Sequence, residues 1–191
     1  RRPAIAMTRT IDLIRHGQST FNAHFDVTGE DPLHFDARLT EKGHAQAADA
    51  RRLLDGKAYD LIVTSPLTRA VQTSLGIFAD ALGRVPFMVE TLHRERVESS
   101  GDVGRPPAEL AAEFKQLDFG ALSDAWWVTA EPNHIGVPYE PLEHFLPRVE
   151  GFRDWLRRRP EKRIAVVGHA TFFLHLTGAN LKNCEILSWQ P

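Results

Sequence analysis

Three short apolar segments of the chain each end at residues that can bind or attack a phosphate group. The segments are residues 10–14, 61–64 and 164–167, which lead into Arg15-His16-Gly17, Ser65-Pro66-Leu67-Thr68-Arg69 and Gly168-His169. If these segments are parallel strands of an open α/β sheet, their carboxyl ends meet at the edge where ligands bind. We therefore expect two histidines and two arginines to gather at one edge. That set predicts a pocket for a dianion and favours phosphoryl-transfer chemistry.

The rest of the chain alternates between β-rich and helical segments, which predicts βαβ units and a mainly parallel sheet. Further strands are expected at residues 85–89 and, at the sheet edge, 185–189. Helices are expected from the cap at Thr40 to Leu54, from the cap at Ser65, after Pro106-Pro107, along Phe145, Val149, Phe152 and Leu156, and after His169. Helices between strands predict an α/β fold.

Two segments fit this alternation less well. Residues 17–39 read as a polar loop that is too long for a connector, which makes them a candidate active-site loop. Residues 93–140 mix glycine, proline and charge with weak periodicity, and we interpret them as an excursion over the sheet rim. The whole chain, 1–191, is therefore expected to form a single domain.

Composition argues against several classes of protein. The net charge is −2 and the basic residues are scattered, which does not favour nucleic-acid binding. No segment is long and apolar enough to span a membrane. The single cysteine, Cys184, excludes an internal disulfide and indicates a cytoplasmic protein. Residues 1–7 are basic but lack the apolar stretch of a signal peptide, and we assign them no function.

His16 is the candidate nucleophile. A neutral imidazole can attack phosphorus directly, which divides one difficult displacement into two easier steps. A neighbouring guanidinium disfavours the imidazolium form and so keeps the ring nucleophilic. Gly17 lets the backbone approach a phosphate closely. The alternative is that Arg-His-Gly is an ordinary turn.

Arg69 and His169 are expected beside it. Arg69 lies in the first turns of a predicted helix, where backbone amides already favour anions; the alternative is a surface arginine in a helical ion pair. His169 follows a buried strand and can hydrogen-bond phosphoryl oxygens, whereas the similar dipeptide Gly43-His44 follows no strand. The histidines lack metal-ligand spacing and the arginines repel cations, so no metal is expected.

Four blocks of sequence resemble one known family, the histidine phosphatase superfamily of phosphoglycerate mutase-like proteins. They are Leu13-Ile14-Arg15-His16-Gly17-Gln18-Ser19-Thr20-Phe21-Asn22, Leu39-Thr40-Glu41-Lys42-Gly43-His44-Ala45-Gln46-Ala47, Ser65-Pro66-Leu67-Thr68-Arg69-Ala70-Val71-Gln72-Thr73 and Val166-Val167-Gly168-His169-Ala170. The matches follow the family order from residue 11 to about residue 175. Four ordered matches are far more specific than any one of them.

The resemblance implies roles for these residues. His16 would be the phosphorylated nucleophile, and Arg15, Arg69 and His169 would hold the phosphoryl group with help from Asn22. The implied fold is a three-layer α/β/α sandwich with a mainly parallel central sheet. The family's phosphatases need neither a metal nor an organic cofactor.

The proton donor is where the sequence departs from the family pattern. The leaving oxygen needs a nearby acid, and in the family this is often a glutamate shortly after the strand expected here at 85–89. Glu95 fits best, Glu98 and Asp102 remain alternatives, and the glycine-tryptophan-glutamate-glycine pattern common in the mutases is missing. Glu95 could instead form a surface ion pair with a neighbouring arginine.

The same departure favours a hydrolase over a mutase. The predicted function is a metal-independent phosphomonoester hydrolase that acts on a small phosphorylated substrate, releases inorganic phosphate and works through phospho-His16. Alternatives are a phosphoglycerate-type phosphomutase and a catalytically silent protein that binds a phosphorylated ligand.

Residues outside the four blocks leave the substrate open. A second acidic group of a substrate could bind Arg94, Arg96 and Arg105. Trp126 and Trp127 could bind a planar portion or simply pack in the core. The sequence predicts neither the natural substrate nor the oligomeric state.

Overall fold

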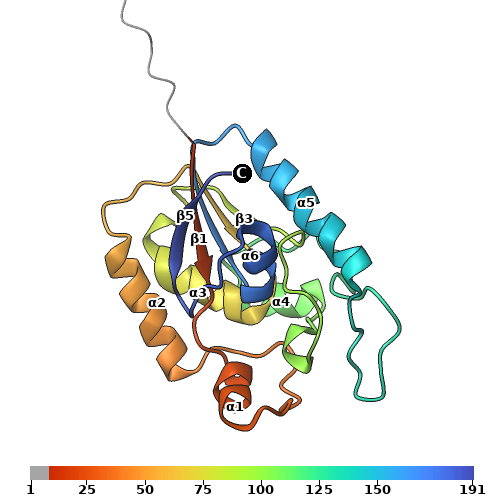
Figure 1. Cartoon of the computed structure of the whole chain (residues 1–191). Coiled ribbons are helices and arrows are strands. Elements are labelled where there is room, and N and C mark those ends of the chain that lie inside the picture. Colours follow the sequence, from red (N-terminus) through yellow and green to blue (C-terminus); the bar gives the residue numbers. More distant parts are fainter. Residues whose placement is uncertain (1–8) are drawn as a thin grey trace, which may run out of the picture.

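The computed structural model describes residues 9–191, so the amino-terminal segment considered above lies outside the described residues. The strands are β1 (Thr10–Arg15), β2 (Leu61–Thr64), β3 (Phe87–Val89), β4 (Arg163–Gly168) and β5 (Ile186–Trp189). They form one sheet in the order β3-β2-β4-β1-β5 (Figure 1). All neighbours pair in parallel except β5, which runs antiparallel to β1. The prediction of a mainly parallel sheet with an edge strand at the carboxyl end is confirmed.

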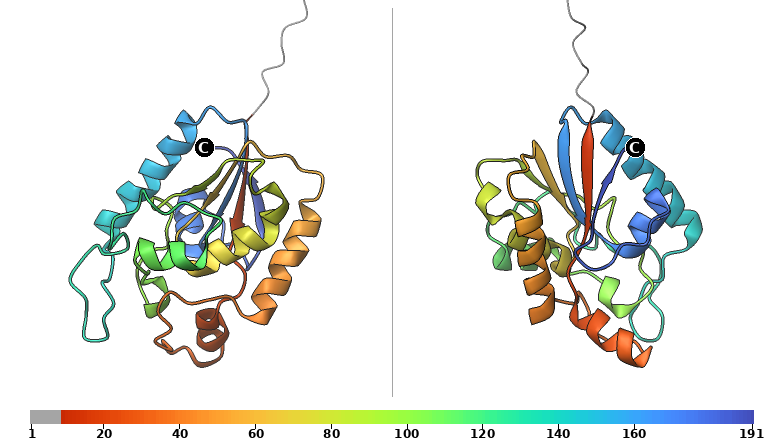
Figure 2. Two further views of the ribbon diagram at one scale, coloured as in Figure 1. Left: turned by 180° about the vertical axis from the view of Figure 1, so that it is seen from behind. Right: turned by 60° about the vertical axis from the view of Figure 1, so that its left-hand side comes forward.

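Helices cover both faces of this sheet, as the right-hand view of Figure 2 shows. The helices are α1 (Thr20–Thr28), α2 (Glu41–Leu53), α3 (Thr68–Phe78), α4 (Pro107–Glu113), α5 (Leu142–Arg158) and α6 (Ala170–Thr177). One apolar cluster packs α5 and α6 against the sheet, and a second packs α2 and α3 against the other face. Alternate strand residues divide between them: Leu13 and Val166 face the first, whereas Ile14 and Val167 face the second. The predicted three-layer sandwich is confirmed.

Strand register brings the candidate residues to one edge. In the ladder between β1 and β4, Arg15 pairs with Gly168, and in the ladder between β2 and β4, Thr64 pairs with Val167. The backbone bonds continue past the strand ends, since the His16 amide donates to the Gly168 carbonyl at 3.0 Å. The three sequence motifs therefore leave the sheet side by side.

The segment expected to be a loop, residues 17–39, contains helix α1, and that expectation was wrong for this part. Ser19 caps the helix: its side chain accepts from the Asn22 amide, and the Asn22 side chain accepts from the Ser19 amide. Gly29 ends it with a positive φ of 71°. No α1 residue is buried, so the helix lacks the long core-facing apolar stripe by which helices of globular proteins are recognised.

The predicted helix start at Ser65 was also wrong. Helix α3 begins at Thr68, and its cap residue, Leu67, makes no side-chain capping bond. The Ser65 hydroxyl instead contacts His169, with its oxygen 2.8 Å from Nε2 of the imidazole. A buried histidine that directly follows the neighbouring strand β4 therefore contacts the hydroxyl that the local sequence had assigned to the helix cap.

The segment from 93 to 140, which was expected to lie over the sheet rim, has little regular secondary structure. It contains a short 3₁₀ turn, Ser100–Asp102, and helix α4. Its own apolar cluster packs on α3 and includes Leu110, Phe119 and Trp126 together with Val71 of the helix. This packing holds α4 against α3.

Gly43 in α2 is expected to resist substitution because backbone of the loop after β1 lies against it. A Cβ at Gly43 would lie 2.2 Å from the Gln18 carbonyl oxygen, and one at Gly17 would lie 2.5 Å from the Gly43 carbonyl oxygen. We expect Gly43→Ala to lower the free energy of unfolding by about 1–3 kcal/mol. Equilibrium urea unfolding measures this.

The matched control is Gly151, which also lies within a helix, α5. A Cβ at this position would have no atom of the described chain within 4 Å beyond its own helical neighbours. Gly151→Ala should raise the free energy of unfolding by about 0.5–1 kcal/mol, as alanine does in open helix positions. Equal stabilisation by both substitutions would show that the contact at Gly43 is unimportant.

Candidate active site

A cavity of about 330 Å³ opens at the carboxyl ends of the strands. Five of the sequence-predicted residues line it: Arg15, His16, Asn22, Arg69 and Glu95. They come from the end of β1, from α1, from α3 and from the loop after β3. A sixth, His169, is buried directly beside His16, with the ring centroids 5.3 Å apart. The fold thus brings the predicted residues together.

Hydrogen bonds fix the protonation state of His16. Its Nδ1 lies 2.7 Å from the carbonyl oxygen of Gly17, which can only accept, so Nδ1 carries the proton. Nε2 therefore bears the lone pair, and Nε of Arg69 donates to it at 3.2 Å. Burial, followed by the charges of Arg69 and Arg15, lowers the pKa of His16 well below its ordinary value. The ring is neutral at physiological pH and has its lone pair on Nε2.

Arg69 is held by hydrogen-bond acceptors in the 3₁₀ turn Ser100–Asp102. Nη2 donates to Asp102 at 2.8 Å, and Nη1 donates to the Gly101 carbonyl. The second oxygen of Asp102 accepts from the backbone amides of Glu98 and Ser99, both at 3.2 Å. Because the carboxylate and the guanidinium are almost fully buried, this pair fixes Arg69 beside Nε2 of His16.

His169 offers the site a second imidazole. It caps α6 in extended backbone conformation, and its Nε2 contacts Ser65 as described above. Burial lowers the pKa of His169 well below its ordinary value, and the charge of Arg69 adds to the effect. Its Nδ1 is buried and has no hydrogen-bond partner among residues 9–191. Such a nitrogen is costly unless a ligand or water satisfies it.

Arg15 and Asn22 also line the cavity. Arg15 donates through Nη1 to the Leu181 carbonyl at 2.8 Å, and its buried Nε has no partner in the described part of the chain. Asn22 uses its Oδ1 for the α1 cap, and Asn183 donates to the same oxygen at 3.4 Å. Asn183 also donates to the His16 carbonyl at 3.0 Å, a positioning contact that no sequence pattern indicated.

Glu95 lies at the amino-terminal end of α6. Its Oε1 accepts from the Arg96 and Phe172 amides, and its Oε2 accepts from the Thr171 amide at 2.9 Å. Burial, with the nearby charge of Asp102, raises the pKa of Glu95 to about 7. Oε2 makes a single hydrogen bond to the described residues, so its second lone pair can carry a proton at neutral pH.

The two alternative acids have other partners. Asp102 is ion-paired with Arg69, as described above. Glu98 has 40% of its side chain exposed and pairs with Arg96 at 2.8 Å. Each of these two carboxylates is therefore engaged with a guanidinium of the protein.

Three arginines considered for a second acidic group are already engaged. Arg94 is buried and faces Glu140, and Arg105 bonds to Asp36 and Glu113. Arg96 donates to the Glu140 carbonyl, to Glu98 and to the Tyr139 hydroxyl. Each of the three guanidiniums therefore has a carboxylate partner within the protein.

The tryptophan pair does not line this cavity either. Trp126 is buried in the apolar cluster that packs α4 on α3, called here the α4 cluster. Its ring nitrogen donates to the Arg105 carbonyl at 2.9 Å. Trp127 meets it edge to face. A Cβ at Gly104 would collide with both rings, so the pair packs against that stretch of backbone, as the core-packing alternative expected.

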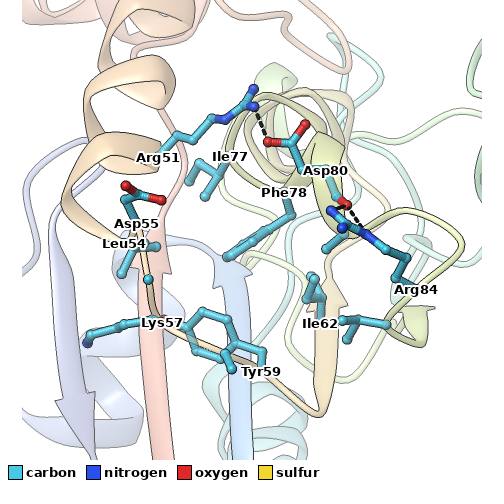
Figure 3. A pocket seen from close by; sticks show the side chains of 14 residues that line it. Arg51, Leu54, Asp55, Lys57, Tyr59, Ile62, Ile77, Phe78, Asp80 and Arg84 are labelled. Carbon is cyan, nitrogen blue, oxygen red and sulfur yellow. Dashed lines mark hydrogen bonds and ion pairs between the residues drawn. The ribbon is translucent and has the colours of Figure 1, made fainter.

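A larger hollow of about 530 Å³ lies at the opposite end of the sheet, where α2 and α3 end (Figure 3). Its basic residues are engaged within the protein: Arg51 pairs with Asp80, Arg84 donates to the Asp80 backbone carbonyl, and Lys57 pairs with Asp12. No histidine stands among the described residues that line it. We therefore take the smaller cavity as the candidate active site.

The described part of the chain contains neither a candidate metal-binding cluster nor a candidate membrane-spanning helix. Within residues 9–191, no group of three or more His, Cys, Asp or Glu side chains is arranged to hold a metal ion. In the same range, no helix combines the length and the apolar character needed to cross a membrane.

Comparison with known proteins places the chain in a family. The model of the histidine phosphatase superfamily (branch 1) matches residues 11–189. The chain belongs to this superfamily, and the resemblance seen in the four sequence blocks is confirmed.

Individual relatives carry both phosphatase and mutase names. A phosphoglycerate mutase-like protein of Arabidopsis thaliana is 29% identical over 92% of this chain and 76% of its own length. The 2-carboxy-D-arabinitol-1-phosphatase of Triticum aestivum is 38% identical over 87% of this chain but only 31% of its own length. The crystal structure of the alpha-ribazole phosphatase from Shigella flexneri superposes with a TM-score of 0.64 at 22% identity, covering 94% of this chain and 89% of that one. The last comparison supports the fold alone.

Proposed function

We propose that this chain is a metal-independent phosphomonoester hydrolase that acts through a phosphohistidine on His16. The observation that carries the proposal is the tautomer of His16, whose Nδ1 proton is held by Gly17 while the Nε2 lone pair lies at the cavity beside Arg69. A neutral imidazole held in this way can attack phosphorus once the Nε–H of Arg69 turns from Nε2 to a phosphoryl oxygen.

The phosphoryl group would bind among Arg15, Arg69 and His169. Arg15, which pairs with no carboxylate among residues 9–191, supplies positive charge, and Arg69, held by Asp102, supplies further N–H donors. Nδ1 of His169, which lacks a partner in the same range, is available to an oxygen of the phosphoryl group. Asn22, through the amide nitrogen of its side chain, would assist. These donors stabilise the charge that spreads over the phosphoryl oxygens in the transition state.

Two displacements then complete the reaction. In the first, Nε2 of His16 bonds to phosphorus as the ester P–O bond breaks, and Glu95 gives its proton to the leaving oxygen. In the second, Glu95 takes a proton from water as the water oxygen attacks phosphorus and the P–N bond breaks. Inorganic phosphate leaves, and His16 and Glu95 return to their starting states. A pKa near 7 suits an acid that must also serve as a base.

A phosphomutase is a weaker alternative for this cavity. A mutase must retain a second anionic group and exclude water. The three arginines that could have bound such a group are engaged with internal acceptors, as described above. A hydrolase needs no such subsite.

The test is hydrolysis of an aryl phosphate in the presence of a strong chelator, with rapid acid-free quenching to trap the phosphoenzyme. We expect turnover that chelator does not reduce, and one equivalent of phosphate on His16, identified by peptide mapping. Chelator-sensitive turnover, or turnover with no phosphoenzyme on His16, would overturn the proposal. Failure on esters but rapid phosphoglycerate interconversion with a bisphosphorylated primer would establish the mutase instead.

A further inference from the structure

Two stacked aromatic rings form one wall of the candidate active site. Phe21 and Phe25, one turn apart on α1, lie with ring centroids 5.4 Å apart and planes inclined by only 17°. Both line the cavity, and Phe25 is 45% exposed. An exposed phenylalanine at the mouth of a polar pocket gains free energy if a ligand covers it.

The wall is anchored to the phosphate-binding residues. A Cβ at Gly101 would lie 3.0 Å from atoms of the Phe21 ring, so this ring packs directly against the Gly101 backbone. The carbonyl of the same glycine accepts from Arg69. A group covering the rings would therefore be attached close to a phosphoryl group bound at Arg69.

The positive charge that lines the cavity beside Glu98 is already neutralised. Arg96 lines the cavity, but each of its three nitrogens has an acceptor, and Glu98 pairs with it at 2.8 Å. Tyr139 covers the guanidinium, which lies 5.0 Å from the ring centroid. A carboxylate or second phosphate on the substrate would meet the exposed Glu98 without gaining this cation.

We propose that this wall, formed by Phe21 and Phe25, binds the alcohol portion of the substrate, and that this portion is an uncharged group with an apolar or planar face. The inference rests on the proposed function for the location of the phosphoryl group. The preferred substrates are then aryl or bulky alkyl monoesters, and phosphorylated acids such as phosphoglycerates are poor substrates. Phe25 is a specificity-determining residue.

Phosphonates test this without requiring turnover. Calorimetry would compare phenylphosphonate, methylphosphonate and phosphonoacetate, which share the anionic head and differ only in the attached group. We expect phenylphosphonate to bind about tenfold more tightly than methylphosphonate, as stacking on an aromatic face would give. Phosphonoacetate should bind no more tightly than methylphosphonate.

The variant Phe25→Ala should remove most of the phenyl preference and leave methylphosphonate binding within about twofold. Phe35→Ala is the matched control, because Phe35 is 46% exposed and does not line the cavity. It should keep the full preference. A phenyl preference unchanged in Phe25→Ala, or tighter binding of phosphonoacetate than of phenylphosphonate, would overturn the inference.

The kinetic counterpart separates this inference from the proposed function. In wild type, kcat/KM for a naphthyl ester should exceed that for glycerol phosphate and 3-phosphoglycerate, and Phe25→Ala should reduce the naphthyl value through KM. Equal hydrolysis of all three esters would refute the aromatic subsite while supporting the hydrolase. Tighter binding of phenylphosphonate without hydrolysis of any ester would support the aromatic subsite and refute the hydrolase.

Discussion

Replacing His16 with alanine is expected to abolish ester hydrolysis, with kcat reduced by at least about 10⁴-fold. The phosphoryl group would still bind, because Arg15, Arg69 and His169 remain, but no lone pair would lie beside it. Burial of His16 excludes bulk water from replacing the imidazole easily. Steady-state hydrolysis of an aryl phosphate and phosphoenzyme trapping would both be measured.

A second variant guards against simple misfolding. Alanine leaves the Gly17 carbonyl without the Nδ1 proton, whereas His16→Asn can donate an amide proton to that carbonyl and still has no nucleophile. Both variants should retain cooperative unfolding and phosphate binding. His44→Ala changes an exposed histidine of α2 and should keep wild-type activity. Substantial turnover in His16→Asn would rule out the phosphohistidine route.

The motifs that directly follow a strand could be predicted from the sequence, because the end of the strand fixes their location. Arg15 is the last residue of β1, His16 follows it, and His169 follows β4. A parallel register between adjacent strands leaves little freedom in where such residues emerge. Their apolar runs are buried on both faces, which is a strong local signal. The sheet and the centre of the site follow from that signal.

The supporting residues were harder to predict because their partners are distant in sequence. Asp102 holds Arg69 across 33 positions, Ser65 meets His169 across 104, and Asn183 reaches the His16 carbonyl across 167. No periodicity or cap pattern encodes such pairs. Asp102 was considered only as an acid, although its burial beside Arg69 makes it a positioning residue.

The aromatic wall was missed for a related reason. Phe21 and Phe25 lie on α1, whose lack of buried residues hides it from pattern analysis. Trp126 and Trp127 were considered as a surface for a planar portion of the substrate, because adjacent tryptophans are easily noticed in a sequence. They pack instead in the α4 cluster, and only the three-dimensional arrangement distinguishes a packed ring from one that faces a cavity.

Glu95→Gln should affect substrates in proportion to how much their leaving group needs a proton. For an alkyl phosphate, the first turnover should slow by about 10²–10³-fold, the range that general acids contribute. For a nitrophenyl phosphate, whose leaving group departs as a stable anion, the first turnover should be nearly retained. The later attack of water also needs Glu95 as a base. Stopped-flow measurements should therefore show a burst of nitrophenolate followed by slow steady-state release.

The pH dependence gives an independent measure of the same role. Because the pKa of Glu95 is raised to about 7, the acid form persists at neutral pH and is lost as the pH rises further. Wild-type turnover of the alkyl ester should fall above about pH 7, and this alkaline limb should be absent in Glu95→Gln.

The amide introduced by Glu95→Gln would also face the Thr171 N–H, which the carboxylate now satisfies, so the free energy of unfolding should fall by about 1–3 kcal/mol. That loss is common to every substrate and cannot distinguish leaving groups. Equal slowing of the first turnover for the alkyl and nitrophenyl esters would therefore mean that Glu95 only supports the structure of the site. Glu98→Gln provides the comparison, because Glu98 is partly exposed and ion-paired with Arg96. That variant should leave both the burst and the alkaline limb unchanged if Glu95 is the acid.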